Sequence, residues 1–304
     1  MGIVNRLRRS LRRVNAAPST LAAAPVPMVS RQKPSVSIVL GSYNRRPFLE
    51  AAIESVRANC VDIPHEIIVI DGGSSDGSLD WLMSQRDIVT IVQHNRGSFR
   101  GKPIERKSWG YFMNLGFKAA QADWILMISD DCVLLPGAIA ASLETARQAV
   151  ASGKRVGGVA YFFRNWPADR RYYVQETLGA RLMVNHGLFS REAMQVVGFA
   201  NEDDYVFYKA DGDLSLRIWD ADYAIIPAPD SLVEHYYDDA EMVRQSNNSV
   251  LDHDRGVYAQ QWGHLRGKPR RVEIETIDAS RTAETVFGAI LSRSSAPQEQ
   301  HPNG

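Results

Sequence analysis

Apolar runs of strand length alternate with amphipathic segments along the first half of the chain. The apolar runs lie at residues 37–42, 66–71, 87–93 and 123–129. Segments with apolar residues at helical spacing follow them, at about residues 47–59, 78–85, 108–121 and 136–152. Apolar strands that alternate with amphipathic helices predict a mostly parallel sheet covered by helices on both faces. The predicted fold class is therefore α/β, with ligands beyond the carboxyl ends of the strands.

The second half of the chain has a less regular pattern. The segment VGGVAYFFRNWPADRRYYVQ, residues 156–175, predicts strands and an aromatic loop, and DGDLSLRIWDAD, residues 211–222, predicts a helix. Two short strands around a proline turn are predicted for YAIIPAPDSLVEHY, residues 223–236. The pattern weakens after Asp239, where one amphipathic helix is predicted at residues 283–293 before a disordered end.

Charge and composition divide the chain into three parts. Residues 1–34 form a basic head and an Ala/Pro linker, because no Asp or Glu precedes Glu50 and the linker has no packing pattern. The folded domain is predicted at residues 35–240, and residues 241–304 form a C-terminal extension. Residues 1–15 place apolar side chains on one helical face among arginines. This pattern fits a short helix that lies on anionic lipid, and it equally fits a solvated basic tail.

The composition is that of a soluble globular protein. Of the 304 residues, 44% are hydrophobic and 23% are charged, and 35 basic residues balance 35 acidic ones. This balance argues against a nucleic-acid binder held by a positive field. The only cysteines, Cys60 and Cys132, lack the spacing of a zinc site or a disulfide framework. No apolar run reaches the length of a membrane span and no signal-peptide core is present, so we expect the protein in the cytoplasm.

A glycine-rich turn after the second predicted strand allows two interpretations. Residues 73–77, GSSDG, satisfy the GxSxG pattern of a hydrolase nucleophile elbow, with Ser75 as nucleophile and Asp211 and His235 as partners. The position argues against this hypothesis, because the turn follows only the second strand and no HGGG-type loop precedes it. Alternatively, Asp71 at the strand tip accepts an imide N–H of uracil or thymine, or the N–H groups of guanine. Two glycines after Asp71 let a ligand approach the backbone, although Asp71 also fits a plain turn residue.

Four segments together resemble a known family. They are SIVLGSYNRRPFLEAAIESV, IIVIDGGSSDGS, WILMISDDCVLLPGAI and KADGDLSLRIW, in this order within residues 35–240. This ordered set resembles the family 2 glycosyltransferases of GT-A fold. The resemblance implies a GT-A-type sheet with a Rossmann-like nucleotide half at residues 35–135 and a mixed acceptor half at residues 136–240.

The resemblance also implies an activity. Such an enzyme moves a sugar, with inversion, from a nucleotide-sugar donor to a hydroxyl of an acceptor, helped by Mn²⁺ or Mg²⁺ on the diphosphate. The implied donor is a UDP-, GDP- or dTDP-sugar, and the implied acceptor is a saccharide or a lipid-linked molecule. The implied setting is the assembly of a surface polysaccharide or glycolipid at the inner face of a membrane.

The resemblance assigns the donor site residue by residue. Ser42, Tyr43 and Asn44 end the first strand against the nucleoside, and Asp71 reads the base. Gly72 joins them, at a position where many members carry a second aspartate.

A helix in the segment KSWGYFMNLGFKAA corresponds to one that packs beneath the donor in the family. Asn114 of this helix is the implied donor-binding residue. Trp109 belongs either to the same site or to the core.

The segment ISDDC matches the family's DxD region, where carboxylates at a strand end reach the ribose and bind a divalent metal. Ser129 stands at the first acidic position, so Asp131 is the implied metal ligand and Asp130 takes over the ribose contact. His235 ends a predicted strand where the family often has a histidine that completes the metal site. A histidine in that place is equally typical of a structural role.

The segment KADGDLSLRIW matches the region of the catalytic base. Asp211 falls on the base, Ala210 replaces the usual glutamate before it, and Asp213 is predicted to cap the helix. An inverting transfer needs such a base, because the acceptor hydroxyl loses its proton as its oxygen attacks.

Rival functions stay open at this point. A non-catalytic binder of nucleotide-sugars or glycans is favoured by Ser129 and Ala210, which stand where acids are usual. A serine hydrolase through Ser75 is less favoured. A nucleotidyltransferase comes last, because SYNRR has arginines but lacks a glycine-rich phosphate loop.

Overall fold

The computed structural model describes residues 33–236, 247–267 and 276–278. These described residues belong to one compact unit. The predicted lipid-contacting helix at residues 1–15 and the helix predicted at residues 283–293 lie outside the described residues. None of the described helices combines the length and the apolar character needed to cross a lipid bilayer.

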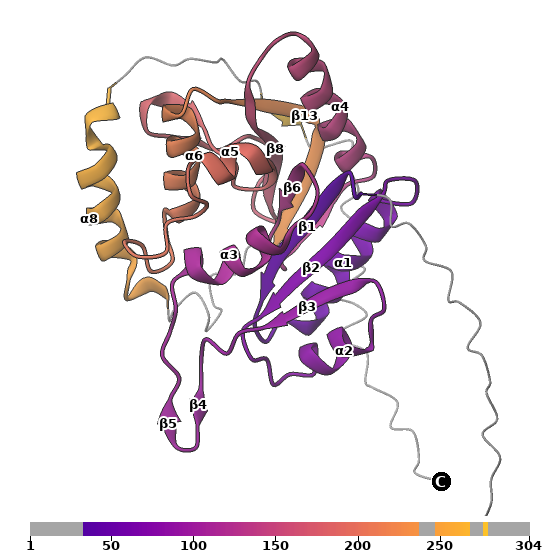
Figure 1. Ribbon diagram of the computed structural model, residues 1–304, viewed down its shortest axis with the longest axis vertical. Helices are drawn as coiled ribbons and strands as arrows, with labels where there is room; N and C mark the ends of the chain where they lie inside the picture. Colours follow the sequence, from indigo (N-terminus) through magenta and orange to yellow (C-terminus); the bar gives the residue numbers. More distant parts are fainter. Residues whose placement is uncertain (1–32, 237–246, 268–275, 279–304) are drawn as a thin grey trace, which may run out of the picture. The chain divides into compact units, whose positions relative to one another are not determined.

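A mixed, mostly parallel sheet of eight strands forms the centre of the fold (Figure 1). Its order is β3 (Ile88–Val92), β2 (His65–Asp71), β1 (Val36–Ser42), β6 (Trp124–Met127), β12 (Gly187–Ser190), β8 (Val156–Trp166), β13 (Ala224–Tyr236) and β7 (Cys132–Leu134). The strands β3, β2, β1 and β6 run parallel, and so do β8 and β13. β12 runs antiparallel to β6 and β8, and β7 runs antiparallel to β13. The predicted α/β fold with a mostly parallel sheet is confirmed.

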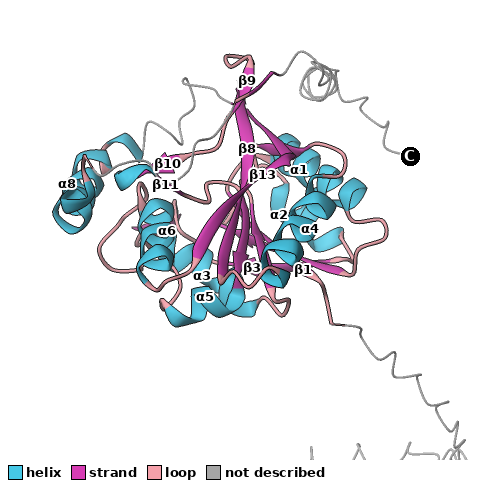
Figure 2. Cartoon of the chain, turned by 90° about the horizontal axis from the view of Figure 1, so that it is seen from above, coloured by secondary structure: helices cyan, strands magenta, loops and turns pink. Residues whose placement is uncertain are grey.

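Helices cover both faces of this sheet (Figures 1 and 2). They are α1 (Arg46–Asn59), α2 (Ser78–Ser84), α3 (Trp109–Ala119), α4 (Ala138–Ala151), α5 (Arg191–Val196) and α6 (Ala210–Asp220). A further helix, α8 (Leu251–Trp262), packs against α6 in a third apolar cluster and not against the sheet. The helices α1, α2 and α4 share one buried apolar cluster with Ile38 and Leu40 of β1. The helices α3, α5 and α6 share a second cluster with Val39 of β1 and Ile70 of β2. Because neighbouring residues of a strand point to opposite faces, β1 contributes to both clusters, and this explains its uninterrupted apolar sequence.

Several short elements complete the described fold. Three two-stranded sheets pair β4 (Ser98–Phe99) with β5 (Lys102–Pro103), β9 (Arg171–Tyr172) with β14 (Ile277–Asp278), and β10 (Glu176–Thr177) with β11 (Arg181–Leu182). The 3₁₀ helices are η1 (Leu178–Ala180) and η2 (Gly263–Leu265).

Strand β13 differs from its prediction. The sequence predicts two short strands around a proline turn, whereas the structure has one strand over Ala224–Tyr236. Its pairing with β8 shifts between Ala228, opposite Tyr161, and Leu232, opposite Phe162. The two prolines within β13 lack an N–H for the ladder, and the strand accommodates Pro229 in a bulge instead of ending there.

Helix α8 is absent from the sequence predictions. Its buried side chains are Asp254, Tyr258 and Trp262, which follow one another at intervals of four residues. The spacing is helical, but one of the three residues is an aspartate, so the segment has no apolar stripe.

The parallel strands bring their carboxyl ends to one edge of the sheet. Ser42 at the end of β1 pairs with Asp71 at the end of β2, and the N–H of Gly72 donates to the Ser42 carbonyl at 2.9 Å. Met127 at the end of β6 pairs with Val39 of β1, so the following residues 128–131 continue towards the same edge. The polar segments SYN, DGG and SDD therefore converge, as the sequence predicts.

Candidate active site

A cavity of about 450 Å³ lies at the carboxyl ends of β1 and β6. Residues from both halves of the chain line it, including the segment 206–209 that leads into α6 and His235 near the end of β13. Seven of the predicted site residues line this cavity: Ser42, Tyr43, Gly72, Asp130, Asp131, Asp211 and His235. The other predicted residues, Asn44, Asp71 and Asn114, lie outside its lining.

Asp130 and Asp131 follow β6 and are almost completely buried. Nη1 of Arg45 lies 3.1 Å from Oδ1 of Asp130 and 2.6 Å from Oδ2 of Asp131. Burial raises the pKa of Asp130 to about 6, although the charge of Arg45 opposes this rise. Burial also opposes the ionisation of Asp131, but His235 and Arg45 outweigh it and hold the pKa of Asp131 well below its usual range. At neutral pH Asp131 is therefore the firmly ionised member of the pair.

A hydrogen bond of Nδ1 orients the ring of His235 so that Nε2 faces Asp131. Nδ1 of His235 donates to Oδ1 of Asn165 at 2.9 Å, and Nδ2 of Asn165 donates to Asp169 and Tyr173, which fixes the direction of the amide. Nε2 of His235 faces Oδ2 of Asp131 at 3.6 Å. Because Nδ1 donates to Asn165, Nε2 is the ring nitrogen available for a metal beside the Asp131 carboxylate, an arrangement typical of metal-binding histidines.

These two side chains fit part of a divalent metal site. Carboxylate oxygen and imidazole nitrogen both ligate Mn²⁺, but within the described residues no group of three His, Cys, Asp or Glu side chains is arranged to hold a metal. Asp131 and His235 therefore need further ligands from water or from the phosphates of a substrate, as is usual for Mg²⁺ in phosphate-binding enzymes. Arg45 supplies positive charge at the same carboxylate.

Asp211 lies in the first turn of α6 and lines the cavity. Its Oδ1 accepts the N–H of Gly212 at 2.8 Å. Burial raises the pKa of Asp211 above its usual value, and the hydrogen bond and the charge of Lys209 only partly offset that effect. A carboxylate that is more basic than usual and faces a cavity has the properties of a general base.

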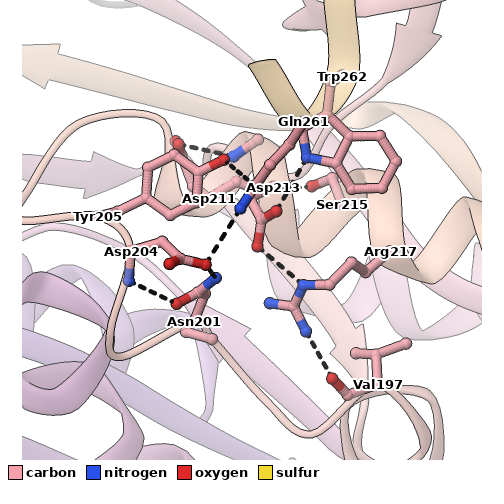
Figure 3. A network of polar contacts seen from close by, with 12 residues as sticks. Val197, Asn201, Asp204, Tyr205, Asp211, Asp213, Ser215, Arg217, Gln261 and Trp262 are labelled. Atoms are coloured by element: carbon pink, nitrogen blue, oxygen red, sulfur yellow. Dashed lines mark hydrogen bonds and ion pairs between the residues drawn. The ribbon is translucent and has the colours of Figure 1, made fainter. Parts of the chain in front are cut away.

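Asp213 does not cap α6, contrary to its prediction. The N-cap residue is Lys209, with no side-chain capping bond, and Asp213 is 1% exposed. Oδ1 of Asp213 accepts Nε1–H of Trp262 at 2.9 Å, and Oδ2 accepts Nε–H of Arg217 at 2.8 Å (Figure 3). Asp213 therefore links α6 to α8, two residues after Asp211 on the same helix.

The same network continues into the loop before α6 (Figure 3). The hydroxyl of Tyr205 donates to Oε1 of Gln261 at 2.6 Å, and Nε2 of Gln261 donates to Oδ2 of Asp204 at 3.1 Å. Gln261 and Trp262, at the end of α8, thus bond to both sides of the segment that carries Asp211.

Replacement of Trp262 by phenylalanine tests this connection. The Trp262→Phe variant loses the indole N–H that Asp213 accepts, and hydrogen bonds to charged groups contribute about 1.5–3 kcal/mol. We expect the free energy of unfolding, measured by urea denaturation, to fall by about that amount. Trp124→Phe is the control, because the half-buried Trp124 packs against the first apolar cluster, apart from this network. An equal loss in both variants contradicts the proposed contribution of the Asp213–Trp262 bond.

Asp254 holds the cavity wall from α8. Its carboxylate is fully buried and accepts the backbone N–H groups of three consecutive residues, Val206, Phe207 and Tyr208, at 2.7–2.9 Å. The 206–208 segment lines the cavity and directly precedes Lys209 and α6. The position of this wall thus depends on a carboxylate nearly fifty residues further along the chain.

The glycine-rich turn after β2 is held by polar contacts with the end of β1. Oδ1 of Asp71 accepts the N–H groups of Gly73 and Ser74, both at 2.8 Å, while its Oδ2 is buried and has no hydrogen-bond partner among the described residues. Asn44 accepts the N–H of Ser75 at 2.8 Å through Oδ1, and its own N–H donates to Oγ of Ser74 at 2.9 Å. Asn44 therefore positions the turn, and Asp71 retains one unsatisfied acceptor.

Ser75 lies apart from its predicted hydrolase partners. It is exposed and lies outside the cavity that Asp211 and His235 line. The hydrolase hypothesis for GSSDG is wrong, because the fold does not assemble the three residues. The serines of this turn serve its local geometry instead.

A match to a family of known proteins agrees with this geometry. The sequence model of glycosyl transferase family 2 matches residues 37–200, more than half of the chain. The chain belongs to glycosyl transferase family 2. The predicted resemblance is confirmed.

Individual proteins resemble this chain in sequence or in fold at low sequence identity. A β-1,3-glucosyltransferase of Campylobacter jejuni, named for the acceptor GalNAc(5)-diNAcBac-PP-undecaprenol, is 24% identical over 58% of this chain, which spans about half (52%) of that relative's length. The mannosyltransferase PcManGT of Pyrobaculum calidifontis, solved with GDP-Man and Mn²⁺, has a TM-score of 0.51 at 16% identity over 88% of this chain and 77% of its own. S. aureus TarS 1–349, solved with UDP-GlcNAc, has a TM-score of 0.53 at 12% identity over 74% of this chain and 66% of its own. The GT-A-type fold is therefore confirmed.

In this family 2 chain, the predicted donor-site residues Asn114 and Gly72 have structural contacts with neighbouring parts of the protein. The Asn114 amide donates to the Ala200 carbonyl and the Glu202 carboxylate and accepts the Ala200 N–H, so it fastens the 200–202 loop to α3. A Cβ at Gly72 would lie 3.1 Å from the Tyr43 ring. Gly72 thus leaves room for Tyr43 beside the cavity.

The family 2 cavity also contains residues that sequence reasoning missed. Nη2 groups of Arg96 and Arg106 donate to the same oxygen, Oδ1 of Asn247, at 2.9 and 2.5 Å. Burial and the neighbouring charge of Arg96 lower the pKa of Arg106. Lys107 and Lys209 line the cavity as well. These arginines and lysines give the cavity lining positive charge, which fits phosphate-bearing ligands.

His186 also lines the family 2 cavity without having been predicted from the sequence. It is 3% exposed, and its ring lies 5.7 Å from that of His235. Burial, reinforced by His235, lowers the pKa of His186 to about 3, so this imidazole stays neutral at physiological pH. The segment NHG carries no sequence pattern that distinguishes a cavity histidine from a structural one.

Proposed function

We propose that the protein transfers a sugar, with inversion, from a nucleotide-sugar donor to a hydroxyl of a saccharide or lipid-linked acceptor. The observation that carries this proposal is the shared cavity of Asp131 and Asp211. One carboxylate is firmly ionised beside His235 and the other is more basic than usual. An inverting transferase needs both kinds of carboxylate. The ionised one holds the metal for the leaving diphosphate, and the more basic one accepts the proton of the acceptor hydroxyl.

The nucleoside lies, in this proposal, at the ends of β1 and β2. Ser42, Tyr43 and Gly72 line that part of the cavity. Asp71 is buried directly before Gly72, outside the lining itself, and we assign its unsatisfied Oδ2 as the acceptor for an N–H of a base that enters beside Gly72. Asn44 and Asn114 support this region through the GSSDG turn and through α3.

The diphosphate lies near Asp130, Asp131 and the cavity cations. Asp130 contacts the ribose, and Asp131 with His235 holds Mn²⁺ or Mg²⁺. When bound there, such a metal would supply positive charge for the leaving diphosphate. Arg45, which already contacts both carboxylates, adds positive charge there.

Asp211 acts as the base in a single displacement. The acceptor oxygen attacks the anomeric carbon, the bond from that carbon to the diphosphate oxygen breaks, and the acceptor proton moves to the Asp211 carboxylate. Attack opposite the leaving group inverts the anomeric configuration. Positioning and charge neutralisation supply most of the acceleration.

Relatives support the proposed substrate classes. PcManGT was solved with GDP-Man and Mn²⁺, TarS with UDP-GlcNAc, and the Campylobacter relative is named for an undecaprenol-linked acceptor. A lipid-linked acceptor implies work at a membrane, in surface polysaccharide or glycolipid assembly. The segment YAQQWG, residues 258–263, lacks the arginine of the QxxRW motif of processive polysaccharide synthases, which favours single additions.

Release of nucleoside diphosphate from UDP-, GDP- and dTDP-sugars tests this function. With undecaprenyl-linked and saccharide acceptors, we expect one nucleotide class to react and Mn²⁺ or Mg²⁺ to raise the rate. Asp131→Ala should lower the metal-stimulated rate at least about 100-fold. Asp123→Ala, an exposed aspartate at the other end of β6, is the control. Donor binding without any release supports the non-catalytic binder and contradicts the proposal.

A further inference from the structure

A small hairpin projects from the fold after β3 (Figure 1). Its strands β4 and β5 pair Ser98 with Pro103 and Phe99 with Lys102. The two turn residues, Arg100 and Gly101, both have positive φ, at 51° and 74°, which is the signature of a type I′ turn. The N–H of Ile104 donates to the Gly97 carbonyl at 2.9 Å and closes the base. The hairpin is thus a defined structure.

The tip of this hairpin combines an exposed aromatic ring with cations. Phe99 is 67% exposed, and the Arg100 guanidinium carbon lies 5.2 Å from the centre of its ring. Arg100 and Lys102 are also exposed, and no Asp or Glu occurs between Asp87 and Glu105. An aromatic residue among cations is the composition that favours the interface of an anionic bilayer.

The two ends of the hairpin lead to the cavity. Asn95 and Arg96 before it, and Arg106 and Lys107 after it, all line the proposed active site. The hairpin therefore connects its tip directly to two segments of the cavity wall, whose cations fit phosphate. A lipid-linked diphosphate acceptor presents its phosphates at such a surface.

We propose that the β4–β5 hairpin docks on an anionic membrane surface. Phe99 enters the headgroup region, while Arg100 and Lys102 contact lipid phosphates. The choice of a membrane as partner rests on the proposed function, in which the acceptor is lipid-linked. Docking on vesicles is measured without any sugar transfer, so the two proposals are tested separately.

A fluorescent label at the hairpin tests this proposal directly in the full chain. Both native cysteines, Cys60 and Cys132, are buried, so Ser98→Cys provides an accessible thiol for an environment-sensitive dye. We expect a blue shift and an intensity gain of about twofold or more with phosphatidylglycerol vesicles, and little change with phosphatidylcholine alone. Val61→Cys, 81% exposed in the loop before β2, is the control and should not respond. Equal responses at both positions, or none at residue 98 when the protein cosediments with vesicles, overturn the proposal.

Charge and apolar variants give a second readout. Phe99→Asp combined with Lys102→Glu should lower cosedimentation with phosphatidylglycerol vesicles about tenfold, whereas Val61→Asp should leave it unchanged. Donor-induced thermal stabilisation in solution should persist in all variants, so loss of docking is distinguished from failure of the proposed activity. A label that responds to polyuridylate but not to vesicles identifies a nucleic-acid surface and overturns the proposal.

Discussion

Asp211→Asn should lower kcat by about 100- to 10,000-fold, the contribution of a positioned general base. Asparagine keeps the shape of the side chain but cannot take the acceptor proton at neutral pH. Because Asp211 is not assigned to the donor, donor affinity should stay within about twofold of the wild type. Donor titration and single-turnover kinetics measure the two quantities separately.

The same variant should not be less stable than the wild type. Burial raises the folded-state pKa of Asp211, so its contribution to folding becomes more favourable as pH falls towards that pKa and is unfavourable at neutral pH. Asparagine removes this cost, since it carries no charge at any pH. A melting temperature equal to or above that of the wild type at pH 7, with the difference shrinking on acidification, is therefore expected.

Asp220→Asn is the matched control for Asp211→Asn. Asp220 ends the same helix, outside the cavity lining, and its half-exposed carboxylate pairs with Arg181. Its turnover should equal that of the wild type. Undiminished turnover in Asp211→Asn would remove Asp211 from the mechanism.

Asp254→Ala should destabilise the protein by about 3 kcal/mol. The substitution leaves three backbone N–H groups without their charged acceptor, and hydrogen bonds to charged groups are the stronger class. For a domain of this size the loss corresponds to a fall in melting temperature of about 6–12 °C. Turnover should fall as well, because the freed segment forms the cavity wall before Asp211.

Asp252→Ala is the control for Asp254→Ala, because it removes a fully exposed carboxylate from the same helix. It should change the melting temperature by no more than about 1–2 °C. A melting temperature of Asp254→Ala close to that of this control contradicts the role given to the carboxylate. Normal stability combined with lost turnover assigns Asp254 to function alone.

The sequence predicts the strand ends and the residues that they carry. Buried strands have a continuous apolar pattern, and the carboxyl ends of parallel strands must meet at one edge. Ser42 and Asp71 end such strands and Asp131 follows one, so their approximate place is fixed by topology alone. Asp211 is found through the match to a family motif, and the cavity lining includes it.

Residues that act across long stretches of chain escape prediction. Arg106 meets Asn247 across 141 residues, and Asp254 meets Val206 across 48. Nothing in the local sequence distinguishes the buried Asp254 from an exposed aspartate on a polar helix. Arg45 adjoins the predicted Asn44, yet only the folded loop shows that it turns inward to Asp130 and Asp131.

Other predictions place the right residue in the wrong local role. Asp213 was expected to cap α6, but its carboxylate bonds to Trp262 and Arg217 because α8 packs against that side. The proline turn expected in residues 223–236 is a bulge, because β8 pairs with β13 on both sides of it. In both cases tertiary contacts override the local pattern.

Calorimetric titration of the purified protein with UDP-, GDP- and dTDP-sugars, with and without Mn²⁺, is the decisive test of the proposed donor site. We expect saturable binding of one nucleotide class that Mn²⁺ strengthens, and weaker binding of that donor in Asp71→Ala and Asp131→Ala. Absence of binding by every donor to a cooperatively folded protein, or binding unaffected by both substitutions, would contradict the assignment of this cavity as the donor site.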